Sequence, residues 1–156
     1  MAKALSDRLL LAQTKFSGLR GGPPPISDRE AFIEALILVS AADDEIVGEE
    51  METLASVVGH LEAFHDLTEE AISDVISRSL KRVMTEGAEA RAKAISIALR
   101  TEEARKLTFR WACAVALADG EIPESEHAVL KLLQTSFNLS QAEVEASLDE
   151  AVGQRD

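Results

Sequence analysis

The chain has 156 residues, 46% hydrophobic and 28% charged, which is long enough for one globular domain with a packed core. Its 28 acidic residues outnumber its 16 Lys and Arg residues, and the resulting net charge of −12 argues against nucleic-acid binding, which needs a basic face. The single cysteine excludes a disulfide framework and multi-cysteine metal sites, and no apolar run is long enough to span a membrane.

Residues 1–25 are predicted to form an N-terminal arm, separate from a helical domain of residues 26–156. Leu5, Leu9 and Ala12 recur at about one helical turn, which predicts a short helix ending near Phe16. Three glycines and three prolines between residues 17 and 25 cannot continue that helix, so this stretch is predicted to be a linker. The start of the chain lacks a secretory signal, and we expect a soluble, cytoplasmic protein.

The rest of the chain shows helical spacing of apolar residues and almost no strand signal. Several helix starts carry capping signals, and Gly87 separates two helices. The capping signals are Ser27 with Glu30, Thr68, Thr101, and Ser140 with Glu143. Apolar spacing adds helices near residues 51–61 and 130–137. Together these patterns predict an all-α, compact bundle of about seven to eight helices.

An internal repeat relates residues 42–50 to residues 118–126, at an offset of 76 positions. The first copy reads Ala-Asp-Asp-Glu-Ile-Val-Gly-Glu-Glu and the second Ala-Asp-Gly-Glu-Ile-Pro-Glu-Ser-Glu, with five of nine positions identical. Each copy lies between two predicted helices, so the repeated unit is helix, acidic loop, helix. Two such units are expected to pack about a pseudo-twofold axis around one core.

The acidic loops invite comparison with the EF-hand calcium loop. Asp119, Gly120 and Glu126 fit the later positions of that loop, but Val115 and Leu117 stand where its first two side-chain ligands belong. A high-affinity EF-hand is therefore excluded. Two interpretations stay open: the carboxylates are satisfied by amides at a helix start, or they bind a cation.

The duplicated Ala-Asp-Gly-Glu-Ile…Glu signature, Ala118 to Glu126 and the variant copy Ala42 to Glu50, resembles the TerB-like (tellurite-resistance) family over roughly residues 28–150. The resemblance implies a compact bundle of about seven helices and a cytoplasmic role, sometimes at the inner face of the membrane, in stress responses to metals, oxyanions or phage. It also implies that the clustered acids bind metal ions. Carried over by position, the metal ligands would be Asp43, Glu45, Glu50, Asp119, Glu121 and Glu126.

Two departures from the family pattern distinguish the loops. Asp44 stands where glycine is expected, and neither Val47 nor Pro123 is the hydroxyl cap usual before the second helix. Because Gly120 can adopt a positive φ more easily than Asp44, we expect the second loop to bind a cation better than the first. Carboxylate oxygens suit Ca²⁺, Mg²⁺ or Mn²⁺, with dissociation constants on the order of 10⁻⁴ to 10⁻³ M.

No enzyme constellation appears, and no small-molecule substrate is indicated. His60 and His65 are five residues apart, His127 is expected to face solvent, and Cys113 is expected to be a buried, unreactive thiol. The sequence therefore predicts a non-enzymatic, metal-responsive module. The alternative is a metal-free interaction module, in which the acidic surface binds a basic protein partner or a second copy.

Basic residues are concentrated between residues 78 and 110, which hold nine Lys and Arg residues and four acids. By contrast, residues 30–77 hold thirteen acids and no Lys or Arg. The simplest interpretation of the basic stretch is solvated helix faces, or a partner for the acidic loops within a dimer. Weak peripheral contact with anionic lipid is the alternative.

Overall fold

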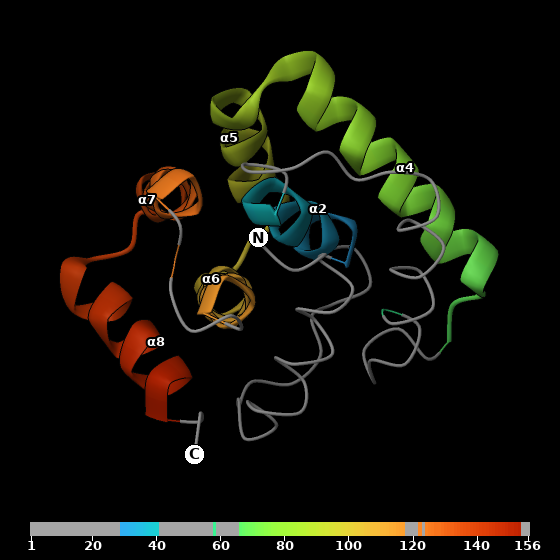
Figure 1. Ribbon diagram of the computed structural model, residues 1–156. Helices are drawn as coiled ribbons and strands as arrows, with labels where there is room; N and C mark the ends of the chain where they lie inside the picture. The colour runs from blue at the N-terminus through green and yellow to red at the C-terminus, as the bar shows by residue number, and fades with distance from the viewer. Residues whose placement is uncertain (1–28, 41–57, 59–65, 118–121, 123, 154–156) are drawn as a thin grey trace.

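The computed structural model describes residues 29–40, 58, 66–117, 122 and 124–153. Over these residues the fold is all-α, with six helices and no strand (Figure 1). The predicted helix class is confirmed, but the described residues hold six helices rather than seven to eight. The predicted helices near residues 5–16 and 51–61 lie outside the described residues, apart from Val58, which is buried in the core. The helices are α2 (Arg29–Ser40), α4 (Glu69–Glu86), α5 (Ala88–Ala98), α6 (Glu102–Leu117), α7 (Glu124–Phe137) and α8 (Gln141–Gly153).

Side-chain caps begin three of these helices, as the sequence predicts. The hydroxyls of Thr68 and Thr101 each accept a hydrogen bond, 3.1 Å long, from the backbone N–H three residues later. Ser140 and Glu143 form the predicted reciprocal capping box before α8, with hydrogen bonds of 2.9 and 3.1 Å. Gly87, at φ 88°, ends α4 and allows the chain to turn directly into α5.

Helix α2 lies at the centre of the described helices (Figure 1). Every side chain from residue 31 to residue 39 is buried, so the helix is enclosed around almost its whole circumference. Helices α4, α5, α6 and α7 all pack against it. One of its enclosed residues, Glu34, is charged and requires compensation inside the fold.

Helix α6 is the second central element. Its residues 112–117 are buried, and it packs against α2, α7 and α8. Trp111 of α6 meets Phe32 of α2 edge to face, with ring centroids 6.2 Å apart and an interplanar angle of 76°. In Figure 1, α4 and α8 lie on opposite sides of the α2–α6 pair. None of the described helices is both long and apolar enough to cross a membrane.

The most extensive helix pairings are α2 with α4 and α6 with α8. The proposed repeat would make these two pairs equivalent, since each joins the helix before an acidic loop to the Thr- or Ser-capped helix that follows. The loops themselves, within residues 41–57 and 118–123, lie almost entirely outside the described residues. The pseudo-twofold relation of the two halves therefore stays a prediction.

Candidate functional site

Of the six predicted metal ligands, the structure describes one. Asp43, Glu45 and Glu50 of the first loop lie outside the described residues, as do Asp119 and Glu121 of the second. Glu126 is described. Within the described part of the chain, no group of three or more His, Cys, Asp or Glu side chains is arranged to hold a metal ion.

Glu126 is the third residue of α7, and its side chain is 0% exposed. The free N–H groups and the dipole of a helix N-terminus favour a carboxylate in the first turn. Its neighbours behave differently, because Glu124 in the same turn and His127 are both exposed. The position of Glu126 in α7 therefore places this carboxylate of the second acidic motif on the buried side of the helix. The prediction that His127 faces solvent is confirmed.

Cys113 is also where the sequence places it, fully buried in α6. Burial raises the pKa of its thiol to about 12, so the thiolate is almost absent at neutral pH. A nucleophilic role is not supported by this geometry.

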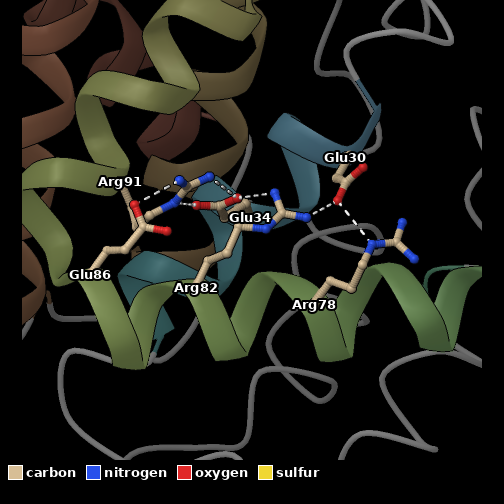
Figure 2. Close-up of polar contacts among 6 residues, drawn as sticks. All are labelled: Glu30, Glu34, Arg78, Arg82, Glu86 and Arg91. Carbon is tan, nitrogen blue, oxygen red and sulfur yellow. Dashed lines mark hydrogen bonds and ion pairs between the residues drawn. The ribbon is translucent and has the colours of Figure 1, made fainter.

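The largest polar assembly among the described residues is a cluster that joins α2 to α4 and α5 (Figure 2). We call it the α2 ion-pair cluster. At its centre the Glu34 carboxylate, 1% exposed, accepts hydrogen bonds from Arg91 Nε at 2.5 Å and Nη2 at 2.9 Å and from Arg82 Nη1 at 3.2 Å. Its members are Glu30, Glu34, Arg78, Arg82, Glu86 and Arg91.

The outer part of the cluster is formed by Glu30 and Glu86. Glu30 Oε1 accepts from both Arg82 Nη2 and Arg78 Nε, and Glu86 Oε1 accepts from Arg91 Nη1 at 3.2 Å. Three carboxylates thus face three guanidinium groups, so the cluster has no net charge. Both arginines that touch Glu34 also reach a second carboxylate, which fixes the orientation of their planar heads.

The protonation of the cluster reflects this pairing. Burial alone would raise the pKa of Glu30, but hydrogen bonds from Arg82 and Arg78 outweigh it and lower the pKa below the ordinary glutamate value. The hydrogen bonds of Arg91 to the Glu34 carboxylate raise the pKa of that guanidinium further. Glu30 and Arg91 are therefore charged at neutral pH.

The sequence interpretation missed this cluster and misassigned part of it. Glu30 was expected to close a capping box with Ser27, which lies outside the described residues; in the structure the Glu30 carboxylate binds two arginines of α4. The basic stretch from residue 78 was expected to be solvated helix faces, but Arg91 is only 12% exposed and Arg82 31%. The available signal was spacing: glutamates at positions 30 and 34 and arginines at 78 and 82 each lie one turn apart on a helix.

Two further basic residues have partners within the fold. Arg105 donates to the backbone carbonyls of Leu99 at 2.8 Å and Ser96 at 2.7 Å, which satisfies groups at the end of α5. Lys106 bridges Glu102 at 3.2 Å and Glu143 at 2.8 Å, which joins α6 to α8. Mainly through its hydrogen bond to Lys106, the pKa of Glu143 falls to about 2.

A pocket of about 150 Å³ lies beside the cluster, where α2 and α5 cross. Three alanines and Ile95 form its apolar part. The polar wall is made by the cluster itself. The lining residues are Glu30, Ala31, Glu34, Arg82, Arg91, Ala94, Ile95 and Ala98.

Comparison with known proteins gives one family. A family model described as Tellurite resistance protein TerB matches residues 29–148, which is well over half of the chain. This agrees with the resemblance of the duplicated acidic signature. No match was found among curated proteins or among solved structures.

Proposed function

The chain belongs to the TerB family, and on that premise we propose that it is a non-enzymatic, TerB-like stress-response module whose acidic loops bind a divalent cation. The ion is Ca²⁺, Mg²⁺ or Mn²⁺, because the candidate ligands are carboxylates. Asp119, Glu121 and Glu126 would hold it in the second loop, and Asp43, Glu45 and Glu50 more weakly in the first.

The observation that supports this proposal most directly is the burial of Glu126. Glu126 is the last residue of the second acidic motif, 118–126, and is buried, whereas Glu124 in the same helical turn is exposed. One ligand of the second loop would thus be held in place by the helix before an ion arrives.

The distribution of basic side chains is the second support. Six carboxylates lie between residues 43 and 52 with no Lys or Arg among them. Five of the nine basic residues between 78 and 110 bind α2 acids, α5 carbonyls or Glu143 instead. Like charges at this density favour binding of a cation or of a basic partner.

The test is thermal unfolding of the chelator-treated chain with each of the three cations, against a control of matched ionic strength. At about 100 times a dissociation constant of ~10⁻⁴ M, a bound ion should stabilise the fold by about 2.7 kcal/mol. Glu126→Gln should remove most of this shift and Glu50→Gln less. Glu124→Gln is the matched control, because it changes the same charge in the same turn at an exposed position.

If none of the cations raises the melting temperature beyond the ionic-strength control, the ion proposal fails. The metal-free module then replaces it, with the acidic surface binding a basic partner or a second copy. That alternative predicts partner binding that weakens steeply as salt rises. The same outcome would leave the family assignment unchanged.

A further inference from the structure

The outer side of α5 carries apolar surface that the described helices do not cover. Ile97 is 74% exposed, and it is one of two large hydrophobic side chains so exposed among the described residues; the other is Met84, 71% exposed near the end of α4. Ala90 and Ala98 of α5 are exposed as well. Exposed bulky hydrophobic side chains that adjoin a pocket are typical of interaction surfaces.

The pocket and this apolar surface are continuous along α5. Ala94 and Ala98 line the pocket, and Ile97 lies between them in sequence. Because successive helical residues are rotated by about 100°, Ala94 and Ala98 lie on one side of Ile97 and Lys93 on the other. A peptide segment lying across α5 would therefore contact the pocket first, then Ile97, and then Lys93.

The positive charges beside this surface are available for binding. Lys93 of α5 and Arg100, two residues after its end, are exposed, and among the described residues their side chains form no ion pair. Arg82 and Arg91 differ, because Glu30, Glu34 and Glu86 already neutralise them (Figure 2). The pocket wall is thus electrically balanced, while Lys93, one turn before Ile97, favours negative charge beside that residue.

We propose that the pocket and the outer face of α5 form a docking surface for an acidic protein segment that carries one bulky aliphatic side chain. The aliphatic side chain enters the pocket against Ala31, Ala94 and Ala98, and burying it provides non-directional attraction. Carboxylates that flank it meet Lys93 and Arg100, which orient the segment and accelerate encounter. This site is separate from the acidic loops and does not depend on cation binding.

An anionic membrane fits the same surface less well. Glu86, the last residue of α4, and Glu89, in the first turn of α5, are both exposed, and a flat anionic surface that reached Met84 as well as Ile97 would meet these carboxylates. A narrow segment avoids these carboxylates, because it crosses α5 beyond Glu89. The pocket, moreover, has the size of a single side chain.

The test uses the full chain, labelled with ¹⁵N, and a short synthetic peptide in which one leucine is flanked on each side by two glutamates. We expect amide shifts that cluster at Ala31 and at residues 93–98. Replacing the peptide leucine by alanine, or its glutamates by lysines, should abolish these shifts. Clustered shifts of equal size with the lysine peptide, or shifts confined to other helices, would overturn the proposal.

Two variants and one control locate the contact on the protein. Lys93→Glu with Arg100→Glu should weaken peptide binding roughly tenfold or more, because it replaces two attractions by repulsions at exposed positions. Ala98→Leu should weaken it by filling the pocket from an exposed position where folding tolerates the change. Lys131→Glu changes an exposed charge on α7 and should leave binding unchanged.

A parallel arm separates the membrane from the peptide. Vesicles containing phosphatidylserine should not sediment the chain at physiological salt. The opposite result is that the vesicles sediment the chain, that Lys93→Glu with Arg100→Glu abolishes this sedimentation, and that the acidic peptide causes no amide shifts. That result would assign the surface to anionic lipid and reject the protein partner. Because none of these measurements involves Glu126 or Glu50, failure here is distinguishable from failure of the cation proposal.

Discussion

Glu34 offers the sharpest test of how the centre of the molecule is held together. The change Glu34→Gln keeps the shape of the side chain and removes its charge. Three hydrogen bonds from Arg82 and Arg91 then lose their charged acceptor inside the fold. Breaking a buried ion pair by removing one partner costs about 3–5 kcal/mol, because the other charge is left uncompensated.

The cost here should fall at the low end of that range. Arg82 is 31% exposed and keeps Glu30, and Arg91 keeps Glu86, so both guanidinium groups retain some solvation and one other carboxylate. We expect a loss of about 3 kcal/mol in the free energy of unfolding. For a domain of this size that corresponds to a fall of roughly 6–12 °C in melting temperature.

The assay is urea and thermal unfolding followed by far-ultraviolet circular dichroism at neutral pH. Glu103→Gln is the control, because Glu103 is exposed on α6. The pair Glu34→Gln and Arg91→Met should lose less stability together than the sum of the single changes, since each removes the partner of the other. A loss below about 1 kcal/mol for Glu34→Gln would refute the view that this cluster anchors α2 to α4 and α5.

Four further predictions concern acid, the α4–α5 junction, the cap of α4 and the N-terminal arm. The pKa of Glu143 is depressed to about 2, so its stabilising contribution is complete above the ordinary value of 4.5 and disappears as pH falls toward 2; Glu143→Gln should flatten the melting-temperature profile in that window. Gly87→Ala should lower the free energy of unfolding, measured with urea, by about 1–2 kcal/mol, because φ 88° with ψ 161° is strained for any residue with a Cβ. Thr68→Ala should lower it by about 1 kcal/mol, because α4 loses its N-terminal cap. Deleting residues 1–22 should leave the melting temperature nearly unchanged, and a large fall would make the arm part of the core.

Local signals predicted the helices well because those signals act over a few residues. The caps at Thr68, Thr101 and Ser140, and the break at Gly87, each depend on contacts within one turn, and all four are found in the structure. The same holds for the buried Cys113, whose neighbours in α6 are apolar.

The ion-pair cluster could not be predicted in this way, because the pairs that join α2 to α4 and α5 link residues 48–57 positions apart in the chain. Glu30 had a plausible local partner in Ser27, and the matching one-turn spacing of Glu30 with Glu34 and of Arg78 with Arg82 does not show that the two helices lie side by side. Glu34 was not noticed, since a single glutamate in an apolar helix reveals its burial only when the surrounding helices are in place. Among the candidate metal ligands, Glu126 is the one whose burial the structure shows, and the sequence did not predict that burial.

Because Cys113 is buried, the reactivity of its thiol reports how often the helices separate. It is the only thiol in the chain, and it lies within the helix against which α2, α7 and α8 all pack. A thiol reagent can reach it only in molecules whose helices have separated, so the labelling rate is the intrinsic rate multiplied by the open fraction. If opening costs about 5 kcal/mol, labelling of the native chain is slowed roughly a thousand- to ten-thousandfold. Any ligand that closes the bundle more tightly, cation or peptide, would slow the reaction further in proportion to its binding free energy, without an engineered label.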